Sequence, residues 1–306
     1  MTESAIAFFD GRLMPLKDAN VNIATHAFNY GTAVFEGIRG YWNDQEEELY
    51  VVQAGPHFAR LQRSARVLQI DLPYTVQELV AHTKDMLKAN QFREDVYIRP
   101  LAYKADAAIK VGLSGIKSGF GMFAVPMGNY VATGGIQVSV SSWRRIADNM
   151  IPSRAKVSGA YVNAALSSDQ AKVDGYDEAI MLADDGHVSE ASSSNLFMVR
   201  GGVLITPPVT ADILEGITRQ VAIDLAREIS VPVEVRPIDR TELYSAEEIF
   251  LCGTGVQLAA VISVDRRPVG EGKPGPITLA LQELYYDLVR GRSARHRHYV
   301  TPVYRG

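Results

Sequence analysis

The chain has 306 residues, of which 47% are hydrophobic and 22% are charged, and its formal net charge is −4. This length favours two domains, and the composition is that of an ordinary soluble globular protein. The mildly acidic balance gives no electrostatic reason to expect nucleic acid or an anionic membrane as a partner. No apolar run reaches about eighteen residues and the N-terminus lacks the pattern of a signal peptide, so we expect a cytoplasmic protein without a membrane span. The single cysteine, Cys252, excludes an intrachain disulfide and any multi-cysteine metal site, and we expect no metal.

Three short turns predict β-hairpins, because Asp-Gly and Gly-Gly supply the positive φ angles that tight antiparallel turns need. The turns are Asp10-Gly11, Asp185-Gly186 and Gly201-Gly202, and each lies between two short strand-like segments. Apolar side chains recur about every four residues over 217–229, which predicts an amphipathic helix. Residues 61–68 and 281–288 show similar spacing and predict two further helices.

Hairpins mixed with helices indicate an α+β fold with antiparallel or mixed sheets and flanking helices, and not a doubly wound parallel sheet. The Gly- and Pro-containing segment 126–135 separates two strand-like segments and is typical of a linker. We therefore expect a small N-terminal domain over residues 1–125, an interdomain loop over 126–135 and a large domain over 136–306. The basic segment 290–298 is expected to be a frayed, solvated terminus.

Lys156 is the candidate for covalent chemistry. Lysine amines form Schiff bases with carbonyl cofactors, and pyridoxal phosphate also needs a carboxylate at its ring nitrogen and a donor beside its phenolic oxygen. Tyr161 follows five residues later, and Glu190 lies at the end of a predicted strand. A lysine in a polar turn is by itself usually a solvated surface group, and only the combination makes Lys156 a candidate.

Three segments have the chemistry to bind a phosphate group. Gly216 opens a predicted helix, whose N-terminal amides, together with the hydroxyl of Thr218, attract an anion. A glycine turn at 253–255 offers the hydroxyl of Thr254, and Arg60 could bind phosphate through two parallel hydrogen bonds. Each has an ordinary alternative when taken singly: a plain helix start, a plain turn and a surface arginine.

Tyr97 and Arg99 are expected on one face of a strand, because residues two apart project in the same direction. An exposed face with a solvated arginine is an equally good explanation of this pair. His26 and Tyr30, four residues apart, could share a helical face, where we expect a packed structural pair. The sequence motifs of serine hydrolases and zinc peptidases are absent, so neither class has support.

In combination these segments resemble the branched-chain amino-acid aminotransferases, which are fold-type IV pyridoxal-phosphate enzymes. The resemblance extends from about Phe8 to Val269 and includes, in order, residues 26–39, 97–100, 155–156, 175–176, 189–190, 195–197, 216–219 and 253–254. It implies that the large domain over 136–306 is the cofactor-binding domain, that the cofactor site lies at the domain interface, and that the cofactor is pyridoxal 5′-phosphate. The order and number of the motifs are specific for the fold and the cofactor, and less specific for the substrate.

The resemblance also implies roles for the cofactor-binding residues. Lys156 would hold the cofactor covalently and, once released by substrate, would move the proton between the substrate Cα and the cofactor C4′. Glu190 would pair with the protonated ring nitrogen, and Tyr161 would bond the phenolic oxygen. The phosphate would be bound by Arg60, Ile217, Thr218 and Thr254.

The substrate would be bound, by the same resemblance, by Tyr30, Phe35, Tyr97, Arg99, Tyr130, Thr254 and Gly255. Tyr97 and the turn at 254–255 would take the α-carboxylate. Arg99 would reach the distal carboxylate of glutamate or 2-oxoglutarate, and the aromatic residues would form the wall of an apolar pocket.

The implied activity is a ping-pong transamination from L-leucine, L-isoleucine or L-valine to 2-oxoglutarate, by an enzyme that is at least a homodimer. The chain departs from the family at Ala191-Ser-Ser-Ser194, which is closer to the D-amino-acid aminotransferases of the same fold. A D-amino-acid or (R)-amine transaminase and an aminodeoxychorismate lyase, on the same fold, are alternatives. A phosphate-ligand-binding module without catalysis, in which Lys156 is a surface residue, is a further alternative.

Overall fold

The computed structural model describes residues 5–128 and 134–305. Contacts between residues divide the chain into two compact units. The first consists of Met1–Gly128, Ala155–Gly159 and Asp287–Gly306, and the second of Asn129–Arg154 and Ala160–Tyr286. One division of the chain thus falls inside the segment 126–135 that we expected to be the interdomain loop. The expected single domain over 136–306 differs from this arrangement, because residues 155–159 and 287–305 pack with the first unit.

The first unit is built on an antiparallel sheet with the strand order β17-β5-β4-β6-β7-β1-β2, in which β3 also pairs with β6. Its strands are β1 (Ile6–Phe9), β2 (Arg12–Pro15), β3 (Ala33–Phe35), β4 (Ile38–Asn43), β5 (Glu48–Val52), β6 (Val96–Lys104), β7 (Ser118–Pro126) and β17 (Val300–Pro302). The hairpin predicted at Asp10-Gly11 joins β1 to β2, and both turn residues have positive φ.

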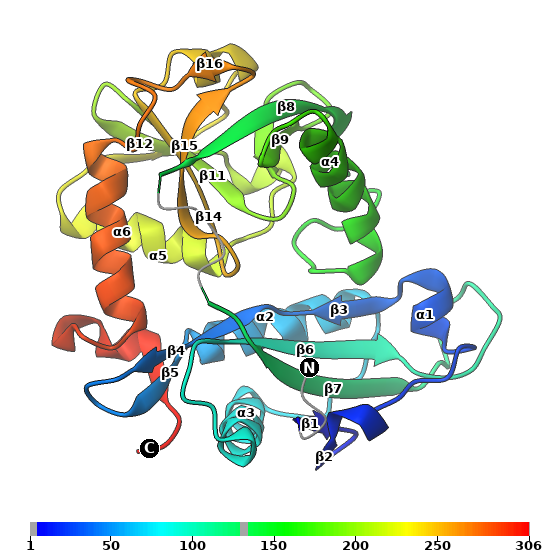
Figure 1. Ribbon diagram of the computed structural model, residues 1–306. Helices are drawn as coiled ribbons and strands as arrows, with labels where there is room; N and C mark the ends of the chain where they lie inside the picture. The colour runs from blue at the N-terminus through cyan, green and yellow to red at the C-terminus, as the bar shows by residue number, and fades with distance from the viewer. Residues whose placement is uncertain (1–4, 129–133, 306) are drawn as a thin grey trace. The chain divides into compact units, whose positions relative to one another are not determined.

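Helices α2 and α3 pack against each other and against strands of this sheet (Figure 1). The helical segments of this unit are η1 (Leu16–Asp18), α1 (His26–Tyr30), α2 (Ala54–Val67), α3 (Val76–Asn90) and η5 (Ala294–Tyr299). Phe58 and Leu61 on α2 and Leu79 on α3 are fully buried, so these helices contribute apolar faces to the core. Thr75 and Glu78 form a capping box that fixes the start of α3.

The C-terminal segment is packed, and the expectation of a frayed terminus at 290–298 is wrong. Arg290 forms an ion pair with Asp95 at 2.8 Å, and β17 pairs with β5. The carboxylate of the fully buried Glu48 accepts the backbone N–H groups of residues 303–305. The partners lie about 200 residues or more away in the sequence, so the local basic composition did not indicate them.

The second unit contains a mixed sheet with the strand order β10-β9-β8-β15-β14-β11-β12-β13, and β16 pairs with β15. Strand β8 runs parallel to β9 and β15, β12 runs parallel to β13, and the other neighbours are antiparallel. The strands are β8 (Ile136–Arg144), β9 (Glu178–Leu182), β10 (Val188–Ala191), β11 (Asn195–Arg200), β12 (Val203–Thr206), β13 (Val233–Val235), β14 (Glu248–Gly253), β15 (Gln257–Val264) and β16 (Arg267–Pro268). The predicted turns at Asp185-Gly186 and Gly201-Gly202 connect β9 to β10 and β11 to β12.

Helix α4 packs on β8 and β9, and α5 packs on β13 and β14 (Figure 1). The helical segments that lie wholly or partly in this unit are η2 (Ser158–Ala160), α4 (Tyr161–Val173), η3 (Val209–Ala211), α5 (Ile217–Glu228), η4 (Arg240–Tyr244) and α6 (Pro276–Val289). Two sheets, one antiparallel and one mixed, with flanking helices confirm the predicted α+β fold. Within residues 5–128 and 134–305, no helix has the length and apolar character needed to cross a membrane.

Candidate active site

Lys156 lies outside the helices and strands, yet both of its backbone polar groups are fixed. Its N–H donates to Ser64 Oγ on α2 at 3.1 Å, and its carbonyl accepts the N–H of Phe35 on β3 at 3.1 Å. The next residue, Val157, forms a β-bridge with Val34. The amine Nζ lies 5.0 Å from the centre of the Phe35 ring. The backbone of the candidate lysine is therefore held by residues of the first unit on both sides.

The segment that carries Lys156 also approaches the end of α1 very closely. Gly159 donates its N–H to the carbonyl of Gly31 at 3.2 Å. Gly31 has φ of +66°, and a Cβ at this position would lie 2.8 Å from the Cα of Gly159. Only glycine at position 31 combines this backbone conformation with this close approach.

Helix α2 presents a buried polar face toward β3. His57, Arg60 and Ser64 are three and four residues apart and therefore share one face of the helix, and all three are buried. Glu36, which follows β3, is fully buried and accepts hydrogen bonds from Arg60 Nε at 2.6 Å and Nη2 at 2.8 Å. Nδ1 of His57 lies 2.8 Å from the same carboxylate.

Burial by itself would raise the pKa of Glu36, but the guanidinium of Arg60, helped by His57, holds this pKa well below its usual range. Burial lowers the pKa of His57, although Glu36 opposes that shift. Glu36 is therefore a carboxylate paired with Arg60. The sequence predicts a phosphate contact for Arg60, and the structure places the Nε–Nη2 edge of its guanidinium on Glu36.

Tyr97 and Arg99 lie on the same face of β6, as expected from their spacing. Arg99 Nη2 donates to the Tyr97 hydroxyl at 2.9 Å, and its guanidinium lies 4.4 Å from the centre of the Phe35 ring. Among the described residues, the buried Nε of Arg99 has no hydrogen-bond partner. Phe35 is thus the common neighbour of Arg99 and Lys156.

Tyr30 is the last residue of α1, and 37% of it is exposed. Its ring lies 4.8 Å from that of His26. His26 is itself fully buried and bonded through Nδ1 to Thr32 Oγ1 at 2.7 Å and through Nε2 to the carbonyl of Lys110 at 2.8 Å. His26 is therefore a packed structural residue. Tyr130, the other expected wall residue, lies outside the described residues.

In the second unit, Glu190 on β10 is buried and surrounded by donors. Arg145 Nη2 lies 2.8 Å from its Oε1. Asn195 Nδ2 and the backbone N–H of Leu214 donate to its Oε2 at 2.8 and 3.2 Å. Hydrogen bonds to a carboxylate favour its charged form. Glu190 is therefore suited to pair, as an anion, with a cationic group.

The start of α5 is a second feature of this unit, and it has the chemistry of an anion site. Gly216 is the N-cap residue, and within the described chain no side chain caps the helix. The first N–H groups of a helix, here those of Ile217 and Thr218, have no acceptor within the helix. A Cβ on Gly216 would lie 1.8 Å from Asn195 Oδ1, so the helix start is fitted against the residue that holds Glu190.

The remaining expected residues also lie in the second unit. Thr254 and Gly255 form the turn between β14 and β15 and are partly buried. A Cβ on Gly253 would lie 3.4 Å from the Cβ of Ser194, so the turn packs beside the segment 191–194 that departs from the family. Tyr161 is the first residue of α4 and is half-buried.

Five residues of these clusters were not singled out as site residues by the sequence: Glu36, His57, Ser64, Arg145 and Asn195. Glu36 and Asn195 lie inside motifs that carry the family resemblance, so the motifs contained the only indication of them. Cys252, in contrast, carries no chemistry here, because burial raises the pKa of its thiol to about 12.

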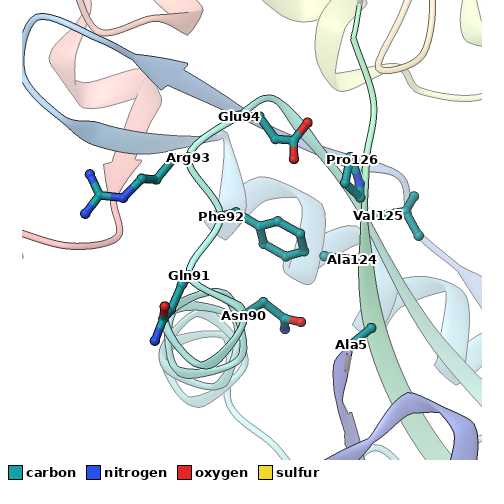
Figure 2. Close-up of a pocket in the computed structure, with 9 residues that line it drawn as sticks. All are labelled: Ala5, Asn90, Gln91, Phe92, Arg93, Glu94, Ala124, Val125 and Pro126. Carbon is teal, nitrogen blue, oxygen red and sulfur yellow. The ribbon is translucent and has the colours of Figure 1, made fainter. Parts of the chain in front are cut away.

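A cavity of about 600 Å³ lies in the first unit, where the end of α3, the loop before β6 and the end of β7 meet (Figure 2). Phe92 and Val125 line it, and Asn90 at its edge is already bonded to the backbone N–H and carbonyl of Ile6. None of the candidate residues lines this cavity, so it is not the candidate active site.

Residues 33–264 match the family model for class IV aminotransferases. The chain therefore belongs to the class IV aminotransferases, and the resemblance seen in its motifs is confirmed. The matched range contains the candidate residues of both units except Tyr30.

Within this class, similar proteins include branched-chain aminotransferases. The chain is 48% identical over 300 residues to the probable branched-chain-amino-acid aminotransferase of Aquifex aeolicus, covering 97% of this chain and 96% of that one. It is 41% identical to the branched-chain aminotransferase of Thermoproteus uzoniensis, solved with norvaline, with a TM-score of 0.95 and coverage of 98% and 100%. It is 39% identical to the pyridoxal-phosphate form of the Thermobaculum terrenum enzyme, with a TM-score of 0.94 and coverage of 99% of both chains.

Proposed function

We propose that the chain is a pyridoxal-phosphate-dependent branched-chain-amino-acid aminotransferase. It moves the amino group of L-leucine, L-isoleucine or L-valine to 2-oxoglutarate by a ping-pong mechanism. The names of relatives that match nearly the whole chain, and the norvaline and pyridoxal-phosphate complexes among them, support this activity. The structural observation that carries it is Lys156, whose backbone is fixed at both ends while its amine lies over Phe35.

The residues of the second unit fit the polar groups of this cofactor. A pyridine nitrogen that carries a proton needs a carboxylate, and Glu190 is buried among donors that favour its charged form. A phosphate needs N–H donors and positive potential, which the start of α5 offers at Ile217 and Thr218, without an acidic residue in its first turn. We assign the Thr254 hydroxyl to the same phosphate and the Tyr161 hydroxyl to the phenolic oxygen.

Arg60 is assigned to the phosphate as a cation whose orientation is set by Glu36. Because Glu36 accepts from Nε and Nη2, these two groups are engaged within the protein. We therefore expect Arg60 to meet the phosphate with the edge of its guanidinium that does not face Glu36.

When bound, the cofactor supplies an aldehyde that takes up amino groups and a ring that withdraws electrons from the substrate Cα. The Lys156 amine would have two roles: it would hold the cofactor at its aldehyde carbon, and it would move the proton at the substrate Cα. Glu190 keeps the proton on the ring nitrogen.

Phe35, Tyr97 and Arg99 are assigned to the substrate. Phe35 offers an apolar surface beside the Lys156 amine, which suits a branched aliphatic side chain. The buried Nε of Arg99, which lacks a hydrogen-bond partner among the described residues, suits the distal carboxylate of 2-oxoglutarate. Tyr97 and the turn at Thr254 and Gly255 are assigned to the α-carboxylate, and Tyr30 and Tyr130 to the pocket wall.

We also propose that the working enzyme is a cytoplasmic homodimer or a higher homo-oligomer. Four large apolar side chains of the first unit, Ile23, Phe28, Ile109 and Val111, are 70–80% exposed. Thr25 forms a β-bridge with Ala107, so the two segments that carry these residues are neighbours, and exposed apolar residues that gather in one patch mark an interaction surface. The mass of the native protein in solution tests the oligomeric state, and a monomer at working concentrations would contradict the proposed dimer.

The presence of a covalently bound cofactor tests the enzyme assignment. The purified protein should be yellow, and borohydride should abolish this absorbance by reducing the bond to Lys156. The Lys156→Ala variant should never form the absorbing species. A protein that stays colourless with added pyridoxal phosphate would exclude the proposed activity.

Half-reactions with single amino donors test the substrate. L-leucine is expected to convert the cofactor to its amine form faster than D-alanine or (R)-phenylethylamine. Faster conversion by D-alanine would instead assign the chain to the D-amino-acid transaminases, to which the segment 191–194 is similar.

A further inference from the structure

We propose that Ser64 is a positioning residue for Lys156. Its hydroxyl fixes the lysine backbone and thereby keeps the amine where it can bond the aldehyde carbon of the cofactor. The proposal rests on the proposed function and adds a residue that belongs to none of the expected contacts with cofactor or substrate.

The contact is direct and shielded from solvent. Ser64 is fully buried, and its Oγ accepts the N–H of Lys156 at 3.1 Å. Lys156 lies in no helix or strand, so no ladder of backbone hydrogen bonds holds it. Its carbonyl is bound on the other side by the N–H of Phe35 at 3.1 Å. These two contacts fix the two peptide groups that flank the lysine Cα.

The two contacts come from α2 and β3, which are joined by hydrogen bonds of buried side chains. Ser64 belongs to α2, and Phe35 ends β3. Glu36 follows Phe35 and is bound by Arg60 and His57, which lie on the same face of α2 as Ser64. The buried cluster thus holds the helix against the strand, and the serine hydroxyl and the Phe35 amide keep a constant separation.

Loss of the hydroxyl should make formation of the covalent bond between Lys156 and the cofactor less favourable. The other cofactor contacts should stay unchanged. The lysine N–H would lose its acceptor, and the segment would gain freedom at one of its two attachments. The amine would then spend less time at the aldehyde carbon, which lowers its effective concentration there. One hydrogen bond of this kind corresponds to roughly a five-fold change in an equilibrium constant.

Two forms of the cofactor separate this role from a general structural one. Pyridoxal phosphate condenses with the Lys156 amine with loss of water. Pyridoxamine phosphate has an amine in place of the aldehyde, so it uses the phosphate and ring contacts but cannot bond the lysine. We therefore propose to measure the affinity of cofactor-free protein for both forms in Ser64→Ala and in Ser64→Cys, which keeps only a weak acceptor.

Ser167→Ala is the matched control. Ser167 is also a fully buried helical serine, on α4, and within the described residues its hydroxyl has no hydrogen-bond partner. Thermal unfolding of each cofactor-free variant checks that the fold is retained.

The expected result for Ser64→Ala is a roughly five-fold lower affinity for pyridoxal phosphate with unchanged affinity for pyridoxamine phosphate. Ser64→Cys should show a smaller loss, and Ser167→Ala should behave like the natural protein. Equal affinities in Ser64→Ala and the control, or an equal loss for both cofactor forms, would overturn the proposal. If the natural protein binds neither form, the proposed function itself fails, which is a distinct outcome.

Discussion

Arg145 and the buried Glu190 form an ion pair, in which Nη2 and Oε1 are 2.8 Å apart and the side chains are 13% and 5% exposed. Arg145 directly follows β8 and Glu190 lies on β10, so the pair joins two segments of the second unit. The carboxylate assigned to the ring nitrogen is therefore held in place by a cation of the protein itself.

Replacing Arg145 by glutamine should destabilise the cofactor-free protein by about 3 kcal/mol, because a buried charge that loses its partner is costly. The free energy of unfolding in urea measures this loss. Arg144→Gln changes the exposed neighbouring arginine and should cost less than about 0.5 kcal/mol. Equal stability of the two variants would show that the pair contributes little.

The stability of the protein should fall as the solution becomes acidic, and His57 should account for the first part of this fall. Burial lowers the pKa of His57 below its ordinary value of 6.5. Burial by itself would raise the pKa of Glu36, but Arg60 and His57 lower this pKa below its ordinary value of 4.5. Each group therefore binds fewer protons in the folded than in the unfolded chain, so acid favours unfolding.

The contribution of His57 is complete above its ordinary pKa and is lost as the pH falls below 6.5, and that of Glu36 is lost below 4.5. Denaturant unfolding from about pH 7.5 down to about pH 5 should show a shallower decline in His57→Gln than in the natural protein. Identical slopes would argue against a buried neutral histidine at this position.

Replacing Gly216 by alanine should weaken cofactor binding, because its Cβ would lie 1.8 Å from Asn195 Oδ1. Either Asn195 moves away from Glu190 or the start of α5 shifts, and overpacking of this kind costs about 1–3 kcal/mol. The affinity for pyridoxamine phosphate is the direct measurement. Gly112→Ala is the control, since nothing lies within 4 Å of its added Cβ. If both variants bind the cofactor equally, the helix start is not part of the site.

Replacing Arg99 by methionine should raise KM for 2-oxoglutarate about ten- to a hundred-fold, because a charge-assisted hydrogen bond contributes about 1.5–3 kcal/mol. KM for L-leucine, which has no distal carboxylate, should change much less. Arg93→Met, in which an exposed arginine is changed, should leave both constants as they are. Equal increases for the two substrates would place Arg99 at the α-carboxylate instead.

Local sequence patterns predicted the hairpins and several helices because their causes are local. Asp10-Gly11 has the positive φ angles that its residue types allow, and the four-residue spacing over 217–229 produced α5. The three predicted hairpins depend only on residues within a few positions of each turn. The resemblance in the motifs then identified the class IV aminotransferases.

The contacts around the candidate residues could not be predicted in the same way, because their partners are distant in sequence. The sequence indicates that Arg60 is a possible phosphate ligand, but it does not indicate its partner Glu36, which is 24 residues away. Ser64 and Lys156 are 92 residues apart. Ser64 has no sequence feature that distinguishes it from other helical serines, and only its burial and its contact give it a role.

The pairing of β17 with β5 has a consequence for fragments of this protein. A fragment of residues 5–128 would keep β5 but lack the strand that covers its outer side. Its backbone N–H and C=O groups would then be available to any other extended chain, including another copy of the fragment, which promotes aggregation. A synthetic peptide of residues 287–305, added in trans, should pair with the exposed edge of β5 and keep the fragment soluble.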